Sequence, residues 1–220
     1  MAKGLFITFE GGEGSGKTTQ IKMLEQTLKN QQKVVLLTRE PGGSPGAEEI
    51  RRLLVTGDAK RWDSITEAYL FFAARRDHLV RTIWPAMERG EIVICDRFAD
   101  STMAYQGYGE DDNKTRQEMI RRMYADVAGD FKPDLTILLD IPVEIGLARS
   151  KQRAGNDEQR FESKQLTFHE NLRQAYLKMA AAEPERFLVV NANQPPEKVS
   201  QDILDQIEKR GFLLKIQQLG

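Results

Sequence analysis

Cysteine and long hydrophobic runs are scarce in this sequence. It contains one cysteine, Cys95, which excludes an internal disulfide framework and is consistent with a reducing compartment. No run of about 18 apolar residues occurs, so the sequence predicts no helix that spans a membrane. The chain enters an apolar segment at Leu5, which leaves no room for a signal peptide, and we therefore expect a cytoplasmic protein with no membrane partner.

An excess of positive charge is also absent. Lysine and arginine together number 32 against 33 acidic residues, which gives a formal net charge of −1. No overall basic field therefore points to nucleic acid, and any positive charge that matters for function must be local. The two histidines, His78 and His169, lie in predicted helices among polar residues, without partners at a catalytic or metal-binding spacing. We expect both at surface or helix-face positions.

The alternation of apolar runs and helical segments predicts one α/β domain over residues 1–220. The apolar runs are Leu5–Phe9, Val34–Leu37, Ile92–Cys95, Leu135–Leu139 and Phe187–Val190. The helical segments are 46–56, 64–89, 115–128, 143–152, 160–183 and 196–210, with a further helix after the first run. Strands that are apolar throughout are typical of a parallel sheet covered on both faces, here one of five strands. Ligands of such sheets bind beyond the carboxyl ends of the strands.

The first apolar run leads into a glycine-rich loop, "FEGGEGSGKTT". Gly11, Gly16, Lys17 and Thr18 fit the pattern G-x-x-x-x-G-K-[ST], and a helical segment follows directly. Glycines let backbone N–H groups converge on an anion, and the helix N-terminus adds a partial positive charge. We expect Lys17 to reach the β- and γ-phosphates of a nucleotide and Thr18 to bind Mg²⁺.

Several classes of protein use such a loop, and the arginines separate them. A GTPase is not indicated, because the nearest candidate for its base-reading motif, Asn113-Lys114-Thr115-Arg116, has no aspartate and follows no strand. The third apolar run ends in Asp96-Arg97, which suits Mg²⁺ and a second anion better than the grouped acids of a motor ATPase. Four arginines are expected at strand ends or on the adjacent helices: Arg39, Arg51, Arg75 and Arg97. Guanidinium groups bind phosphate oxygens in pairs, so a phosphorylated acceptor is favoured.

Such an acceptor needs no catalytic base. The second pKa of a phosphate monoester is about 6, so its oxygen is already an anionic nucleophile at neutral pH. The remaining obstacle is repulsion between two polyanions, which fixed cations and Mg²⁺ remove. The absence of a Ser-His-Asp set is therefore expected.

Two further segments can be interpreted either as parts of a functional site or as structural elements without such a role. Phe71 and Arg75 are four residues apart on a predicted helix and could bind a nucleobase, although aromatic residues at this spacing usually pack in the core. The stretch "RSKQRAGNDEQRFE", 149–162, is either a solvated loop or a lid that excludes water, and its three arginines favour the lid. Asp140 precedes Pro142 and is better suited to entering a helix than to binding Mg²⁺, and Cys95 is expected to be a buried hydrophobe.

Six motifs taken together resemble those of bacterial thymidylate kinases. They are "FEGGEGSGKTT", "TREPGG", "FFAARR", "CDRFADSTMAYQG", "PDLTILLD" and "NANQP", and they cover nearly the whole chain in order. The resemblance implies a P-loop nucleoside-monophosphate-kinase fold with a short lid. It also implies transfer of a phosphoryl group from ATP to dTMP with Mg²⁺, in a cytoplasmic homodimer.

The resemblance assigns roles to individual residues. Phe71 would stack on thymine, Arg75 would bind the edge of the base, and Arg51 and Arg97 would hold the acceptor phosphate. Tyr105 would pack near C2′ of the sugar. The other acceptor-binding residues implied are Glu40, Pro41, Ser101, Thr102 and Gln106. The ATP-binding set implied is Gly11, Gly12, Glu13, Gly14, Ser15, Gly16, Lys17, Thr18, Thr19, Arg149 and Asn193, with Thr18 and Asp96 at the metal.

The catalytic residues implied are Glu13, Lys17, Arg97, Arg153 and Arg160. Some members of the family carry an arginine directly after the loop acid, whereas Gly14 follows Glu13 here. Because the transferred phosphoryl group still requires a cation, we expect the lid to supply it, from Arg153 first and Arg160 second. Glu162 either contacts the metal or caps a helix.

Two alternatives stay open at this point. One is another nucleotide or deoxynucleoside kinase, in which Glu13 would deprotonate a hydroxyl, although four arginines do not suit an uncharged acceptor. The other is a nucleotide-dependent binding switch with negligible turnover, which would need no second pocket.

Overall fold

The computed structural model describes residues 4–58, 61–109, 113–152 and 165–217. At its centre five strands form one sheet in the order β2-β3-β1-β4-β5, and every adjacent pair is parallel. The strands are β1 (Leu5–Glu10), β2 (Val35–Arg39), β3 (Ile92–Asp96), β4 (Leu135–Asp140) and β5 (Phe187–Asn191). The predicted α/β class and the five parallel strands are confirmed.

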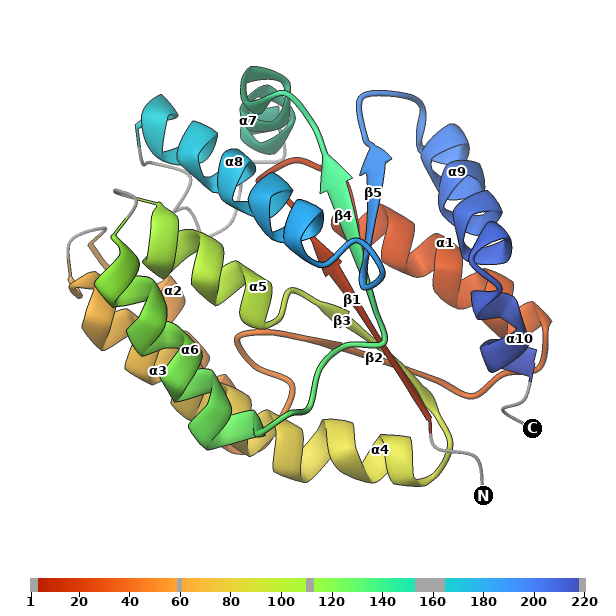
Figure 1. Ribbon diagram of the computed structural model, residues 1–220, viewed down its shortest axis with the longest axis horizontal. Coiled ribbons are helices and arrows are strands. Elements are labelled where there is room, and N and C mark those ends of the chain that lie inside the picture. The colour runs from red at the N-terminus through yellow and green to blue at the C-terminus, as the bar shows by residue number, and fades with distance from the viewer. Residues whose placement is uncertain (1–3, 59–60, 110–112, 153–164, 218–220) are drawn as a thin grey trace.

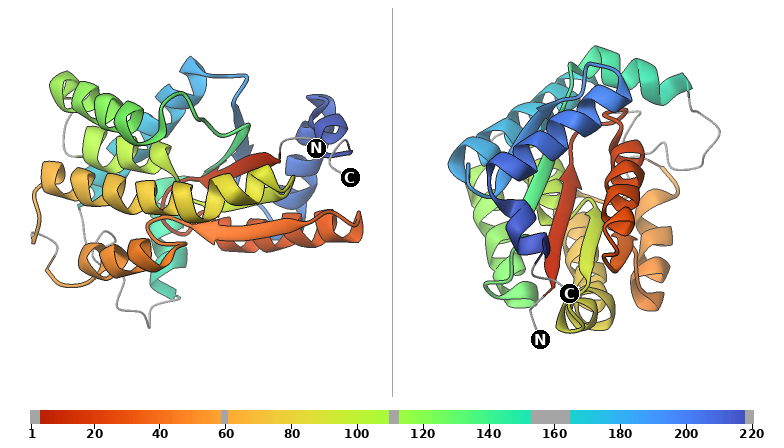
Figure 2. Two further views of the ribbon diagram at one scale, coloured as in Figure 1. Left: turned by 90° about the horizontal axis from the view of Figure 1, so that it is seen from below. Right: turned by 90° about the vertical axis from the view of Figure 1, so that its right-hand side faces the viewer.

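Helices connect the strands and cover both faces of the sheet (Figures 1 and 2). On one side lie α1 (Lys17–Asn30), α9 (Pro196–Lys209) and α10 (Phe212–Gln217). The other side is covered mainly by η1 (Leu79–Ile83), α4 (Trp84–Glu88), α6 (Lys114–Ala128) and α8 (Leu166–Ala182). The helix α3 (Ser64–His78) leads into η1 and packs against α6. The remaining helices are α2 (Pro45–Val55), α5 (Ala99–Thr102), η2 (Met103–Tyr108) and α7 (Val143–Gln152).

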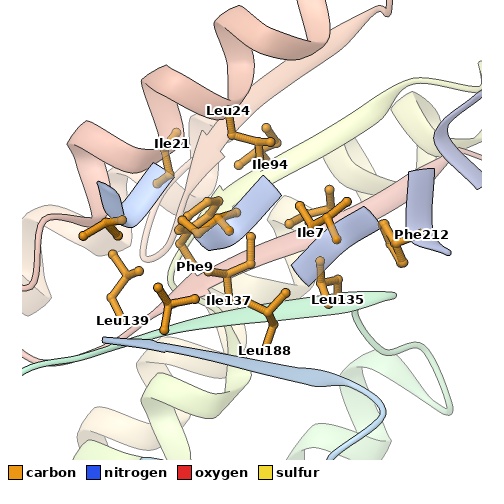
Figure 3. Close-up of a cluster of buried hydrophobic side chains, with 14 of the residues drawn as sticks. Ile7, Phe9, Ile21, Leu24, Ile94, Leu135, Ile137, Leu139, Leu188 and Phe212 are labelled. Atoms are coloured by element: carbon orange, nitrogen blue, oxygen red, sulfur yellow. The ribbon is translucent and has the colours of Figure 1, made fainter. Parts of the chain in front are cut away.

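Alternate side chains of each strand enter different cores. Ile7 and Phe9 of β1 pack with α1, as Figure 3 shows, whereas Phe6 points to the opposite face and packs against η1 and α4. All three side chains are fully buried. Burial on both faces explains why the strands read as unbroken apolar runs, since a solvated face would require alternate polar residues.

Three segments differ from the sequence prediction. The helix expected over 64–89 is interrupted by the π-helical segment η1, a wider turn that often occurs near functional sites. The helical stretch from Ala99 to Tyr108 was not predicted. At the C-terminal end, α10 buries Phe212 and Ile216 in the same core as β1, which gives a structural role to a segment without an assignment from sequence.

The register of the sheet brings the predicted site together. Phe9 of β1 is paired with Asp96 of β3, and Asp140 ends the neighbouring strand on the other side. The loops after these strands therefore meet at one edge of the sheet. Within the described ranges, no helix is both long and apolar enough to cross a membrane.

Candidate active site

The glycine-rich loop connects β1 to α1 at this edge. Gly14 has a φ of 65° and approaches α7 so closely that a Cβ there would overlap the carbonyl oxygen of Gly146. This position therefore requires glycine. The Nζ atom of Lys17 donates to the carbonyl oxygens of Gly11 and Gly12, both at 3.1 Å, and so lies across the mouth of the loop.

The charges around the loop are coupled. Burial lowers the pKa of Lys17 to about 8, and the positive charge of Arg97 acts in the same direction. Burial on its own would raise the pKa of Glu13, but the charges of Arg97 and Lys17 and a hydrogen bond from Tyr105 lower it overall. Two cations and an ionised carboxylate thus lie where β1 and β3 end, and a polyphosphate would relieve the repulsion between the cations.

Arg97 is held in an unusual backbone conformation. Its φ is 66°, in the left-handed region, and its N–H donates to Phe9 O at 3.0 Å. Its guanidinium group donates to Gly11 O at 3.0 Å, Glu13 Oε1 at 3.0 Å and Ser101 Oγ at 3.1 Å. A strained residue that is fixed by so many neighbours is typical of a functional site.

Glu10, the last residue of β1, holds the segment that follows β3 by hydrogen bonds. It is fully buried, and it accepts hydrogen bonds from Phe98 N at 2.7 Å and from Ser101 Oγ at 2.6 Å. Burial, reinforced by the nearby charge of Asp100, raises its pKa to about 7. The sequence analysis did not single out Glu10, because an acid at the end of a buried strand gave no signal of its role.

A cavity of about 150 Å³ lies beside the loop. All ten residues predicted to bind the acceptor line it: Glu40, Pro41, Arg51, Phe71, Arg75, Arg97, Ser101, Thr102, Tyr105 and Gln106. Glu13 lines it as well, so the cavity opens onto the phosphate loop. The structure therefore supplies the second pocket that a phosphoryl transferase needs and a binding switch does not.

Phe71 and Arg75 of α3 line one side of this cavity, and Glu67 precedes them on the same face of the helix. Glu67, Phe71 and Arg75 follow one another at intervals of four residues, so they occupy successive turns of the same face. The ring of Phe71 is half-buried at the cavity surface, whereas Phe72 is 3% exposed and packs in the core. Of these two adjacent rings, Phe71 lines the cavity and Phe72 packs in the core.

Arg75 is the most buried cation of the cavity, with 1% of its surface exposed. Its Nε donates to Glu40 Oε2 at 2.8 Å, and its Nη2 donates to Thr102 Oγ1 at 2.9 Å. Its Nη1 has no hydrogen-bond partner within the described part of the chain. A buried N–H group without an acceptor is costly, so this atom is suited to receive a ligand oxygen.

Both histidines lie in helices, as expected, but neither lies at the surface. His78 is fully buried, with Nδ1 3.0 Å from Glu40 Oε1 and Nε2 2.6 Å from Thr38 Oγ1. His169 is 3% exposed and borders a small cavity that also touches Gly12 and Glu13. Their polar neighbours in sequence concealed this, because the groups that surround them come from distant segments.

The structure describes part of the predicted ATP-binding site. Arg149, in the last turn of α7, donates to Ala192 O at 3.1 Å, which places it beside the turn that holds Asn193. Thr18 and Thr19 begin α1, with the side chain of Thr18 exposed. Arg153, Arg160 and Glu162 lie outside the described residues.

Two acids had been considered for Mg²⁺. Asp140 forms a double hydrogen bond with Arg173 of α8, at 2.7 and 2.9 Å, so it has an ion-pairing role that the sequence did not indicate. Asp96 ends β3 close enough to Lys17 that its charge partly offsets the lowering of the pKa of that amine. Among the described residues, no three His, Cys, Asp or Glu side chains are grouped as a metal site.

Comparison with known proteins identifies this arrangement. The sequence profile described as thymidylate kinase matches residues 9–203. The chain belongs to the thymidylate kinase family. It is 50% identical over 210 residues to a thymidylate kinase of Caulobacter vibrioides, and the match covers 96% of this chain and 99% of that protein. A thymidylate kinase of Magnetococcus marinus is 48% identical over 211 residues, with the same coverage of both chains.

A solved structure in the family agrees with the fold. The crystal structure of thymidylate kinase from Ehrlichia chaffeensis superimposes with a TM-score of 0.73 at 33% sequence identity. The match covers 94% of this chain and 99% of that one. The P-loop nucleoside-monophosphate-kinase fold and the kinase class are thereby established for this chain.

Proposed function

We propose that this protein transfers the γ-phosphoryl group of ATP to dTMP and so produces dTDP and ADP. The observation that carries the proposal is the cavity beside the phosphate loop. Phe71 and Arg75 both line it, and Arg75 Nη1 has no hydrogen-bond partner among the described residues. A thymine ring placed against Phe71 would offer a carbonyl oxygen to that guanidinium group. Membership of the thymidylate kinase family supports the same acceptor.

The acceptor phosphate would lie between Arg51 and Arg97. Arg51 donates to Pro41 O at 2.6 Å, which holds its guanidinium group at the cavity wall. Arg97 is already oriented by Glu13 and Ser101, so little reorganisation is needed when a phosphate arrives. With Lys17 at the donor phosphates, these cations would offset the repulsion between the two nucleotides, and catalysis would consist of positioning and charge stabilisation.

Tyr105 and Glu13 would define the sugar end of the pocket. The hydroxyl group of Tyr105 donates to Glu13 Oε1 at 2.6 Å, so the two side chains hold one another in place. The phenol ring would pack near C2′ and disfavour an additional hydroxyl group there. Glu13 would lie near the 3′-hydroxyl group of the acceptor.

Mg²⁺ fits the side chains at the mouth of the loop. Thr18 offers a hydroxyl oxygen and Asp96 a carboxylate oxygen, and hard oxygen ligands together with substrate phosphates are what Mg²⁺ prefers. When bound, the ion would supply positive charge that stabilises the donor phosphates. We propose these two residues as its protein ligands.

The rest of the donor site is proposed from sequence. Arg149 would pack on adenine, with the backbone near Asn193 on the other side of the ring. Residues 149–162 would form a lid within the single domain of 1–220. Arg153, or else Arg160, would contact the transferred phosphoryl group, since Gly14 leaves no cation after Glu13 in the loop.

A homodimer is supported by exposed apolar side chains on α2, α3 and η1. Four of the exposed large hydrophobic side chains lie there: Leu53, Ile65, Tyr69 and Val80. Ile65 and Tyr69 are one turn apart, and α2 packs directly against α3. We propose this surface as the contact between two copies in the cytoplasm.

An ADP-release assay with a panel of acceptors tests the function. We expect turnover with dTMP, weaker turnover with dUMP, and little with CMP, UMP or thymidine. Turnover with thymidine but not dTMP would favour a deoxynucleoside kinase. ATP binding without turnover on any acceptor would favour a switch.

A further inference from the structure

The proposed acceptor cavity contains two buried polar atoms that make no hydrogen bond to any described residue. One is Arg75 Nη1, a donor, and the other is Gln106 Oε1, an acceptor. Both residues line the cavity, and their side chains are 1% and 2% exposed. Two side chains of the cavity lining therefore carry one donor and one acceptor for which no described residue supplies a partner.

This pattern is complementary to one class of base. Thymine and uracil carry an N3–H donor next to carbonyl acceptors, so they can satisfy Gln106 Oε1 and Arg75 Nη1 at once. Cytosine carries an unprotonated N3 and a 4-amino group, which is the reverse pattern along the same edge. A buried polar group that faces the wrong base would lose its partner, and such losses give strong discrimination.

The discrimination depends on the orientation of an amide. A glutamine side chain that turned over by half a rotation would present N–H donors to the base in place of an oxygen. Glu67, one turn before Phe71 on α3, contacts this amide. Its Oε2 accepts a hydrogen bond from Gln106 Nε2 at 3.1 Å, and the side chain is buried at 7% exposure. Because a carboxylate can only accept, this bond requires the amide nitrogen on the side of Glu67 and leaves the oxygen for another partner.

We propose that Glu67 is a positioning residue that selects thymine and uracil over cytosine by fixing the amide of Gln106. The proposal rests on the function proposed above. It assigns base selection to a residue outside the set that lines the cavity.

The test is the isosteric substitution Glu67→Gln. Its new amide group can donate as well as accept, so Gln106 is free to turn. dUMP and dCMP are the informative acceptors, because they share sugar and phosphate and differ at the pairing edge of the base. We expect the ratio of kcat/KM for dUMP to that for dCMP to fall about tenfold or more, with the KM for ATP unchanged. An unchanged ratio, or an equal loss with both acceptors, would overturn the proposal.

A double-mutant cycle shows whether the effect passes through Gln106. Gln106→Leu removes the oriented oxygen and is expected to lower the same ratio by itself. In the Gln106→Leu background, Glu67→Gln should cause no further change in the ratio. An additional fall of similar size would mean that Glu67 acts by another route and would overturn the proposal. If the unmodified protein used neither dTMP nor dUMP, the proposed function itself would be wrong, and this inference with it.

Discussion

Arg75 and Glu40 form an ion pair of 2.8 Å in which the two side chains are only 1% and 4% exposed. The second oxygen of Glu40 lies 3.0 Å from His78 Nδ1. Since a carboxylate only accepts, Nδ1 carries a proton, and Nε2 lies 2.6 Å from the hydroxyl oxygen of Thr38. A chain of buried hydrogen bonds thus runs from β2 through His78 and Glu40 to the guanidinium group that faces the cavity.

Replacement of His78 should weaken this series of hydrogen bonds. We expect His78→Ala to lower the free energy of unfolding by about 1–3 kcal/mol, because Glu40 loses a buried donor. We expect the KM for dTMP to rise about tenfold while kcat changes less, since Arg75 is then held by fewer contacts. Steady-state kinetics and urea denaturation measure the two effects.

A second substitution of His78 distinguishes the loss of its hydrogen bond to Glu40 from the loss of its packing. In His78→Asn the amide nitrogen occupies roughly the place of Nδ1 and can still donate to Glu40, whereas the bond to Thr38 is lost. We expect this variant to recover most of the affinity for dTMP. If the asparagine variant were as impaired as the alanine variant, the bond to Glu40 would not be what matters.

Substitutions of Phe71 and of the proposed lid residue Arg153 should affect different kinetic constants. Phe71→Ala removes a surface on which the base would stack, so we expect a higher KM for dTMP with kcat little changed.

Arg153→Ala should lower kcat by about 10²–10⁴, because it removes charge stabilisation that matters only in the transition state. Arg160→Ala is the matched control, with a smaller expected effect. A change confined to KM in Arg153→Ala would exclude the lid assignment.

Glu10 should make stability depend on pH. Its pKa is about 7 in the folded protein and close to 4.5 when exposed, so the folded state retains a proton that the unfolded state has released between these values. The stabilisation from this proton is fully present below about pH 4.5 and is lost as the pH rises through 7. Glu10→Gln cannot titrate. We therefore expect the stability of the unmodified protein, relative to this variant, to fall between pH 5 and 7 and to level off by pH 8.

Urea denaturation of both proteins over this range supplies the comparison. Taking the difference between them cancels the groups that titrate equally in both, including the surface acids. A difference that stays constant, or that increases with pH, would show that Glu10 is ionised throughout.

The strands and the phosphate loop could be predicted because their signals are local. Leu5 to Phe9 reads as a buried strand from five consecutive residues, and Lys17 follows the glycines at a fixed spacing. Gln106 belongs to a motif that the resemblance assigned to the acceptor site, but its bond to Glu67 gave no local signal, since it joins residues 39 positions apart. The helical stretch from Ala99 to Tyr108 was missed for a related reason, because it lacks a long apolar face and is stabilised by its contacts with α8 and α6.

The exposed apolar surface on α2, α3 and η1 yields a prediction about assembly. Tyr69 is 61% exposed and lies near the middle of this surface, between Ile65 and Val80 in sequence. We expect Tyr69→Glu to convert a dimer to monomers, because a charge buried in an apolar interface has no partner there, while an exposed position tolerates the change in the folded monomer. Val34→Glu is the control, since Val34 is 66% exposed but precedes β2, outside that surface. Sedimentation velocity should give a dimer for the control and a monomer for Tyr69→Glu, and a dimer for both would place the contact elsewhere.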